Sequence, residues 1–441
     1  MMQKFFKYIV VLILTWEARM LLWRRKPFII AITGSVGKTT TKDAVFHLLK
    51  NTTSVRKSEK SFNSEIGVPL TILGLANAWS DPLSWAKNLC LGFWRIFSSG
   101  NYPKLLVLEV GADHPNDIKR MAFWLKPDIV VITRLPEKPV HVELFSSPEE
   151  VRKEKWELVR ALKADGILVM NGDDPYIREQ SRAVESRIIT FGFDKDCTVK
   201  GELPQVFYEK KEDDIRIPAG LSLRVDCEGK QFAVDLRGVL GAQPAMAILA
   251  ALAVGIARGE SAERMVGALG TLQMPAGRMR IINGKEGSTI IDDSYNASPV
   301  AAEAALETLR AVEGKRKIAL LGDMLELGPY SEEEHKKIGH IAGGFIDILL
   351  TVGERAQWIT EGALIAGMSK ENIKEFVDSE SAGKWMAEHV RAGDIILAKG
   401  SQGSGTNMIR MERAVKLLMA HPEDAEKILV RQEREWQRQY I

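Results

Sequence analysis

The clearest chemistry in this sequence lies in a glycine-containing loop, Thr33-Gly34-Ser35-Val36-Gly37-Lys38-Thr39-Thr40. An apolar run at 28–32 precedes it and a helical pattern at 41–50 follows, so the order is strand, loop and helix. Glycines let backbone N–H groups approach phosphate oxygens, Lys38 can reach the terminal phosphates, and the Thr39 hydroxyl can bind Mg²⁺. The usual first glycine of such loops falls at Ile32, so the strand and helix context carries the prediction. We predict an ATP and Mg²⁺ site whose nucleotide contacts are Gly34, Ser35, Gly37, Lys38, Thr39 and Thr40.

Two further side chains could complete a metal site at this loop. Glu109 ends the apolar run 105–108, where catalytic groups of parallel sheets commonly sit, and His141 follows a later strand after a loop. A carboxylate and an imidazole can both bind a divalent metal. Each also has a plainer interpretation, because strand-end carboxylates are often only solvated and single loop histidines usually lie at the surface. The lysines of the charged helix expected over 149–163 similarly suggest a solvated face.

The elements that must position this loop alternate between strand and helix, which predicts an α/β fold with a mostly parallel sheet. Buried strands are expected at 28–33, 105–110, 129–133 and 167–171. Ligands of such sheets bind at the carboxyl ends of the strands. Polar and apolar residues then alternate within 195–238, which indicates a small antiparallel addition, and an alanine-rich helix is expected at 244–258.

A second alternation of strand and helix patterns begins after the turn Met274-Pro275-Ala276-Gly277. Its expected strands are at 289–292, 318–322, 348–352 and 394–398. A smaller Rossmann-like α/β domain is therefore predicted for 275–441, after a central ATP-binding domain at 28–274. The charged stretch 421–441 is expected to form an amphipathic terminal helix.

Residues 1–27 are predicted to form a separate hydrophobic and basic helix. A helix over 5–23 would be about 28 Å long, close to the hydrocarbon thickness of a bilayer. Glu17 and Arg19 would lie inside the hydrocarbon of a full crossing, so an interfacial helix is equally consistent. The excess of Lys and Arg in residues 4–26 suits the anionic headgroups of a membrane surface. The third interpretation is a helix packed on the protein's own core.

The composition narrows the choice of partner and compartment. Among 441 residues, 45% are hydrophobic and 27% charged, which is typical of a folded globular chain of two or three domains. The formal net charge of +2 and the lack of a basic stripe argue against a nucleic-acid partner. Three widely spaced cysteines without a CxxC pair fit a reducing compartment. We expect a cytoplasmic protein that acts on small molecules, either free or attached to the cytoplasmic face of the inner membrane.

Several motifs, in order and spacing, resemble the Mur ligase family over about residues 28–420. Beyond the loop they are SFNSEIGVPLT at 61–71, LEVGA at 108–112, HVELF at 141–145, KEKWE at 153–157, NGDD at 171–174, DDSYNASP at 292–299 and GDMLELG at 322–328. The first and last of these are most similar to the branch of the family that adds D-alanyl-D-alanine.

The resemblance implies a reaction in which ATP phosphorylates a substrate carboxylate and an amine then displaces the phosphate. The amine would be an amino acid or dipeptide, and the acceptor a carboxylate such as a UDP-N-acetylmuramoyl (UDP-MurNAc) peptide. Arg278 and Asn296 resemble residues of the second domain that reach the nucleotide when the domains close.

The same resemblance implies roles for the residues near the loop. Lys155 matches the lysine that the family carbamoylates with CO₂, and the resulting anion could help to hold a metal in place of a solvated face. The expected catalytic residues are Lys38, Glu109, His141 and Lys155. The expected Mg²⁺ ligands are Thr39, Glu109, His141 and Lys155.

Two departures from the family pattern leave alternatives open. Gly241-Ala242-Gln243-Pro244-Ala245 keeps neither of the asparagines that the family places there to contact the nucleotide base. Full-length relatives also carry a domain that grips the UDP-sugar before the ATP loop, whereas 27 residues precede Phe28 here. The alternatives are a membrane-associated ligase with another acceptor, such as a poly-amino-acid polymer, and a catalytically inactive ATP-binding relative.

Overall fold

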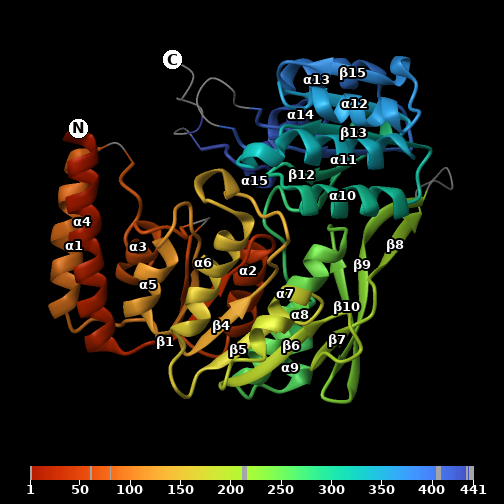
Figure 1. Cartoon of the computed structure of the whole chain (residues 1–441). Helices are drawn as coiled ribbons and strands as arrows, with labels where there is room; N and C mark the ends of the chain where they lie inside the picture. Colours follow the sequence, from red (N-terminus) through yellow and green to blue (C-terminus); the bar gives the residue numbers. More distant parts are fainter. Residues whose placement is uncertain are drawn as a thin grey trace. The chain divides into compact units, whose positions relative to one another are not determined.

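The computed structural model describes residues 2–59, 62–79, 81–210, 216–403, 409–433 and 436 (Figure 1). The chain divides into two compact units. The first comprises 1–201, 225–232 and 246–272, and the second comprises 202–224, 233–245 and 273–441.

A parallel sheet forms the centre of the first unit, with the strand order β7-β6-β5-β4-β1-β3-β2. Its strands are β1 (Phe28–Thr33), β2 (Val55–Lys57), β3 (Leu105–Glu109), β4 (Ile129–Ile132), β5 (Ile167–Asn171), β6 (Arg187–Gly192) and β7 (Val199–Gly201). β4 is apolar throughout, and β1 and β3 are apolar up to their last residue, so these strands occupy the centre of the sheet, where both faces of a strand are covered. The predicted α/β fold with a mostly parallel sheet is confirmed.

Antiparallel strands follow in the chain, as the alternating pattern predicted. The last residues of β9 (Arg216–Cys227) pair antiparallel with β7. Earlier residues of β9 pair antiparallel with β8 (Gln205–Lys210), and β10 (Lys230–Arg237) is the other neighbour of β9. Burial alternates along β9 and β10 because successive side chains of a strand point to opposite faces.

Helices cover the parallel sheet. Those of the first unit are α1 (Met2–Arg25), α2 (Lys38–Leu49), α3 (Gly67–Leu73), α4 (Pro82–Phe97), α5 (Asp117–Leu125), α6 (Pro148–Arg160), α7 (Pro175–Ser181), α9 (Ala262–Leu269), most of α8 (Ala242–Ala257) and the 3₁₀ turn η1 (Val142–Leu144). α4, α6 and α7 each begin with a proline, preceded by a side chain that accepts hydrogen bonds from first-turn N–H groups. The capping residues are Asp81, Ser147 and Asp174.

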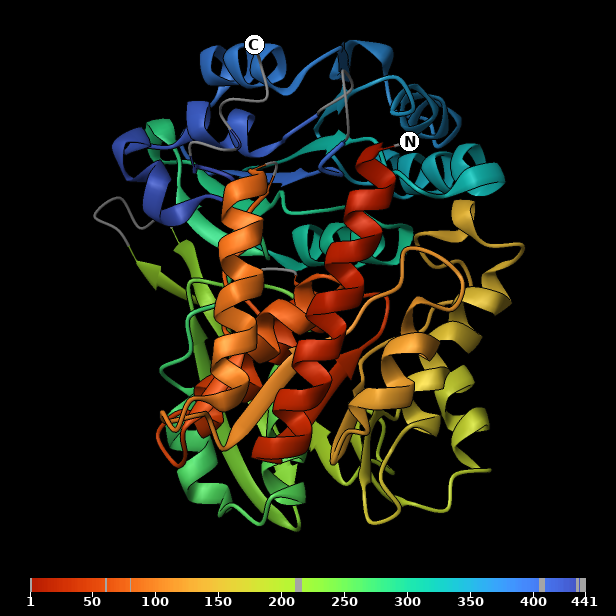
Figure 2. The same cartoon turned by 90° about the vertical axis from the view of Figure 1, so that its left-hand side faces the viewer.

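The N-terminal helix α1 lies beside α4, and the two run side by side in both views (Figures 1 and 2). One face of α1 is buried against the first unit, with Val10, Leu14, Ala18 and Leu21 in its core. The interpretation of a helix packed on the protein's own core therefore holds for this face. No helix among the described residues is long and apolar enough to span a bilayer.

The second unit contains a six-stranded sheet in the order β11-β12-β16-β13-β14-β15. Its strands are β11 (Arg280–Asn283), β12 (Thr289–Asp293), β13 (Arg316–Gly322), β14 (Ile348–Val352), β15 (Ile373–Phe376) and β16 (Asp394–Lys399). All neighbours are parallel except β11 and β12. The helices are α10 (Pro299–Ala311), α11 (Ser331–Gly343), α12 (Gln357–Ile365), α13 (Ser379–His389), α14 (Glu412–Leu418) and α15 (Ala425–Ile428), with 3₁₀ turns η2 (Lys285–Gly287), η3 (Gly328–Tyr330), η4 (Lys370–Asn372) and η5 (Pro422–Asp424).

The predicted amphipathic helix over 421–441 is wrong for residues 421–433. Only η5 and the single turn of α15 are helical between 421 and 433. Arg431 has φ of 57° and is buried, with its guanidinium donating to Glu412 Oε2 at 3.0 Å. This buried ion pair holds the chain in a non-helical course that the charge pattern did not reveal.

Candidate active site

The phosphate loop joins the end of β1 to the start of α2. Gly37 has φ of 87° directly before the first helical residue, a conformation that favours glycine. Gly34 has φ of 143°, and a Cβ built on it would lie 2.0 Å from Thr133 Oγ1. The Lys38 ammonium donates to Gly34 O at 2.7 Å. The loop therefore has the form in which N–H groups at a helix N-terminus can bind phosphate, with Thr39 half-buried and Thr40 buried in the first turn.

Thr133, a residue that the sequence did not single out, fixes the shape of this loop. It follows β4, which pairs with β1, and its hydroxyl donates to Val36 O at 2.7 Å or to Thr33 O at 3.2 Å. The next residue, Arg134, makes a second contact with the loop, because its backbone carbonyl accepts a hydrogen bond from Ser35 N at 2.7 Å. The only sequence signal was a threonine at a strand's carboxyl end, which is common in sheets.

Glu109 lies at the carboxyl end of β3, next to β1, and is buried. Its Oε1 accepts a hydrogen bond from Asn63 Nδ2 at 3.2 Å, and its Oε2 lies 3.7 Å from Lys42 Nζ. Ser58 Oγ accepts from the Glu109 backbone N–H at 3.1 Å. Lys42 was not predicted, although it lies four residues after Lys38 and so on the same side of α2. The solvated interpretation of this carboxylate is wrong.

His141 is positioned by an unusual backbone conformation, with φ of 70° directly before η1. Its Nδ1 lies 3.9 Å from Asp113 Oδ1, so the imidazole faces the loop that follows β3. The side chain is 23% exposed, which is more enclosed than the surface histidine of the plainer interpretation.

Lys155 is buried on α6, with 1% of the residue exposed, so the plainer interpretation of a solvated lysine is wrong. Burial, and then the charge of Lys38, lower the pKa of Lys155 to about 7, while the charges of Asp113 and Glu154 oppose this shift. Glu154 is itself occupied, because its carboxylate accepts from the backbone N–H groups of three residues at the start of α5. Lys155 is therefore a buried amine beside the phosphate loop.

The remaining predicted residues lie in the second unit. Arg278 precedes β11, and its guanidinium lies 4.0 Å from the centre of the Tyr295 ring. Asn296 follows β12, and its backbone carbonyl accepts from Lys399 Nζ at 3.0 Å. The structure brings Lys38, Glu109 and Lys155 to one end of the parallel sheet in the first unit, with His141 on the loop after β4.

The chemistry of the site in the first unit fits a magnesium-bound phosphate group. Ser35 Oγ and Glu109 Oε2 are buried oxygen atoms without a hydrogen-bond partner among the described residues. Oxygen ligands with several waters and phosphates are what Mg²⁺ prefers. No group of three or more His, Cys, Asp or Glu side chains that could hold a metal occurs in the described part of the chain. A metal here would therefore need ligands of other kinds, such as a threonine hydroxyl.

Comparison with known families identifies the chain. Residues 32–255 match the Mur ligase middle domain, and residues 277–402 match the Mur ligase, glutamate ligase domain. The chain therefore belongs to the Mur ligase family, and the predicted ATP-dependent ligase of the Mur type is confirmed at the level of the family.

Similar proteins come from several bacteria. The UDP-N-acetylmuramoyl-tripeptide–D-alanyl-D-alanine ligase of Bacillus subtilis is 29% identical over 396 residues, which are 89% of this chain and 76% of that protein. The ligase of the same name from Mycobacterium leprae is also 29% identical, over 86% of this chain and 71% of its own length. Among solved structures, the MurF ligase from Thermotoga maritima in complex with ADP has a TM-score of 0.74 at 27% identity, covering 95% of this chain and 84% of that chain.

Proposed function

We propose that this protein uses ATP to join a D-alanyl-D-alanine dipeptide to the carboxylate of a UDP-N-acetylmuramoyl-tripeptide in peptidoglycan precursor synthesis. Support comes from the Mur ligase family match and from relatives that carry this name. The observation that carries the proposal is that the amine of Lys155 is buried beside the phosphate loop, whereas an ordinary surface lysine would be exposed to solvent. We assign 28–274 to ATP binding and 275–441 to the second ligase domain.

The proposed reaction has two steps. A carboxylate oxygen of the acceptor bonds to the γ-phosphorus of ATP, the bond to ADP breaks, and an acyl phosphate forms. The amine nitrogen then bonds to the acyl carbon, the bond to phosphate breaks, and the amine loses a proton to water. Loop N–H groups and Lys38 hold the transferring phosphoryl group and offset its charge.

Mg²⁺ at this site would be held by Thr39, Glu109, His141 and a carbamate on Lys155, and would supply charge neutralisation to the phosphates. The carbamate forms when the neutral Lys155 nitrogen bonds to CO₂ and releases a proton. A pKa near 7 leaves a large neutral fraction of this amine at neutral pH, which favours that step. Arg278 and Asn296 are proposed as further nucleotide contacts, on the basis of the resemblance.

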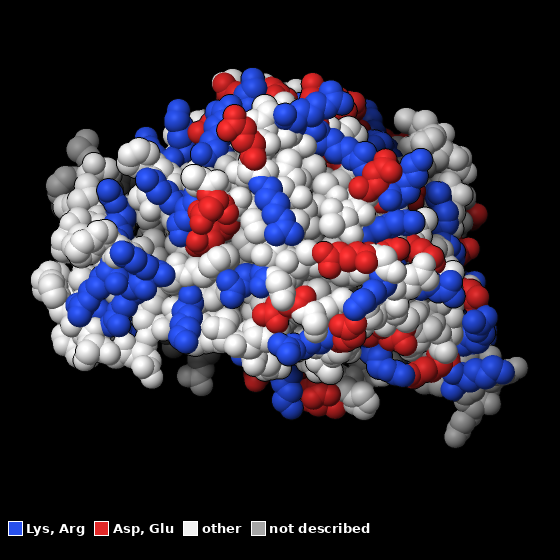
Figure 3. All heavy atoms as spheres, turned by 90° about the horizontal axis from the view of Figure 1, so that it is seen from below, with Lys and Arg blue, Asp and Glu red and all other residues white. Residues whose placement is uncertain are grey.

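We propose a cytoplasmic location with attachment to the inner membrane surface through residues 4–26. On the side of α1 away from its buried face, Tyr8, Leu12 and Trp23 are more than half exposed. The last turns of α1 and α4 are basic, and seen from below, Lys and Arg gather at this end of the first unit among uncharged atoms (Figure 3). Aromatic and basic side chains together suit an anionic headgroup layer. Three widely spaced cysteines without a CxxC pair support the same compartment.

Neither alternative gains support from the comparisons. A poly-amino-acid ligase would act on a polymer in place of the UDP-linked tripeptide, and an inactive relative would bind ATP without turnover.

The test is phosphate release from ATP with Mg²⁺ and bicarbonate, with the dipeptide and the UDP-linked tripeptide added singly and together. We expect release only with both substrates. Lys155→Ala should abolish it, whereas Lys153→Ala, which removes a lysine with a 66% exposed side chain on the same helix, should not change it. ATP binding without release under every condition would contradict the proposal.

A further inference from the structure

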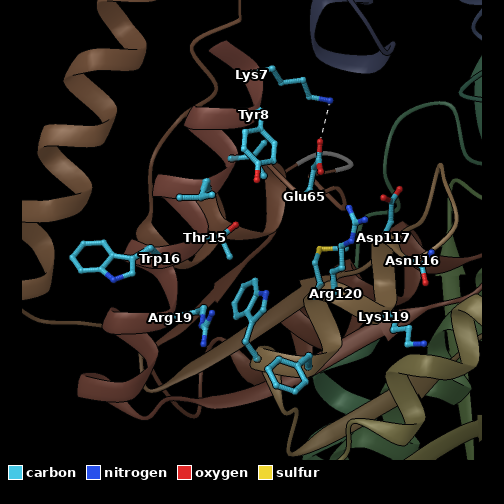
Figure 4. Close-up of a pocket in the computed structure, with 15 residues that line it drawn as sticks. Lys7, Tyr8, Thr15, Trp16, Arg19, Glu65, Asn116, Asp117, Lys119 and Arg120 are labelled. Carbon is cyan, nitrogen blue, oxygen red and sulfur yellow. Dashed lines mark ion pairs between the residues drawn. The ribbon is translucent and has the colours of Figure 1, made fainter. Parts of the chain in front are cut away.

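A long groove runs between α1 and α5 in the first unit (Figure 4). Its volume is about 1110 Å³, and α1, α5 and Glu65 line it. Figure 4 shows Lys7 paired with Glu65 at one end, and Arg19 and Arg120 on the opposite walls formed by α1 and α5.

The walls of the groove present large apolar side chains to solvent. Tyr8, Leu12, Trp16 and Phe123 are 65%, 55%, 47% and 75% exposed. The apolar surface continues onto α4, because Trp16 stacks on Phe93 at 6.4 Å between ring centres. A folded protein rarely leaves so many large apolar groups together in water unless an apolar partner covers them.

Cations line the same groove in excess. Glu65 is paired with Lys7 at 3.0 Å, and Asp117 accepts backbone hydrogen bonds from Asp113 and His114. Three exposed cations have no ion pair or side-chain hydrogen bond within the part of the chain that the structure describes. They are Arg19, Lys119 and Arg120. The groove is therefore complementary to a ligand that combines an anionic group with a hydrocarbon chain.

One end of the groove borders the candidate active site. Glu65 is two residues after Asn63, whose amide donates to Glu109. Asp117 on α5 holds the loop of Asp113, the residue that faces His141. A ligand in the groove would thus lie along a path to the phosphate loop.

We propose that this groove binds a lipid-linked form of the same muramoyl tripeptide, which the ligase accepts in addition to the UDP-linked form. Its phosphate or diphosphate group would lie on the groove cations and its polyprenyl chain on the exposed aromatic wall. The identity of the ligand as the acceptor rests on the ligase function proposed above. A nucleotide carrier supplies the same diphosphate but no hydrocarbon, and would leave the apolar wall in water. The lipid carrier therefore matches both halves of the groove.

Binding is tested with the full chain and phosphatidylcholine vesicles that contain either a polyprenyl phosphate or an equal charge of phosphatidylglycerol. We expect at least about tenfold tighter binding to the polyprenyl phosphate. Arg19→Gln with Arg120→Gln should weaken it about 25-fold, since each cation near an anionic lipid contributes about fivefold. Arg182→Gln with Arg187→Gln removes two exposed charges elsewhere and should have no effect. Phe123→Ser should weaken polyprenyl phosphate binding but not phosphatidylglycerol binding.

Turnover is then compared with the same muramoyl tripeptide carried on UDP or on a polyprenyl diphosphate in vesicles. A lower KM for the lipid-carried form supports the inference. A lower KM for the UDP form, or equal binding to both anionic lipids, overturns it and leaves the ligase function standing. Selective binding of the polyprenyl phosphate without turnover of either acceptor supports the lipid site and overturns the ligase function.

Discussion

Glu17 is a carboxyl group buried between two helices, and its replacement should make the first unit more stable in a pH-dependent way. It lies on α1 with 1% of the residue exposed, and its Oε2 has no hydrogen-bond partner among the described residues. The side chain occupies the space left by Gly92 of α4, where an added Cβ would lie 2.0 Å from Oε2. Burial raises the pKa of Glu17 to about 7 from the ordinary value of 4.5.

The size and direction of the change in stability follow from the raised pKa of Glu17. Between pH 4.5 and 7 the folded carboxyl holds a proton that the unfolded one has lost, so the free energy of unfolding falls as pH rises. Above pH 7 the group is ionised in both states and the full penalty remains. A shift of about 2.5 units corresponds to at most about 3 kcal/mol. Glu17→Met removes the charge with an apolar side chain of similar length and should therefore stabilise the unit by up to about 3 kcal/mol at pH 8.

Calorimetry of the full chain at several pH values measures the difference. At pH 8 the transition of the first unit should rise by about 6–12 °C in Glu17→Met, because 1 kcal/mol shifts a unit of roughly 200 residues by about 2–4 °C. The difference should shrink toward zero as pH falls to 4.5. Glu179 is an exposed residue on α7, and Glu179→Gln should show no pH-dependent stabilisation. A stabilisation that does not vary with pH, or a destabilised variant at pH 8, would refute the reasoning.

Three further predictions concern the loop and the second unit. Gly34→Ala should weaken ATP binding at least about tenfold in titration calorimetry, since alanine at φ of 143° is strained and its Cβ meets Thr133. An unchanged affinity for ATP would contradict this prediction. Thr133→Val should weaken ATP binding about tenfold with the fold intact, because the loop carbonyls lose their hydroxyl donor. Wild-type affinity in this variant would show that the hydroxyl is dispensable. Lys399→Met leaves the buried Asp293 without its cation and should lower the free energy of unfolding of the second unit by about 3–5 kcal/mol in denaturant. Lys370 is exposed, and Lys370→Met should have no measurable effect. Equal effects of the two variants would contradict the role of the ion pair.

The amino-acid sequence by itself determined the phosphate loop and the strands around it. The loop could be predicted because its glycines, its lysine and the apolar run of β1 are consecutive, and local order alone sets the path from strand to helix. The centre of the sheet could also be predicted, since β4 and the first four residues of β3 are apolar runs that must be covered on both faces. The roles of Arg278 and Asn296 stay predictions.

Only the tertiary structure decided which polar side chains surround the loop. Lys155 reads as a solvated lysine within its own helix, but it is buried, close to the charges of Lys38 and Asp113 from distant segments. Thr133 and Lys42 reach the site from β4 and α2, and neither stands in a pattern of its own. Burial of a charged group depends on contacts between distant segments. Periodicity reports only which face of a helix is apolar, so it could not reveal these neighbours.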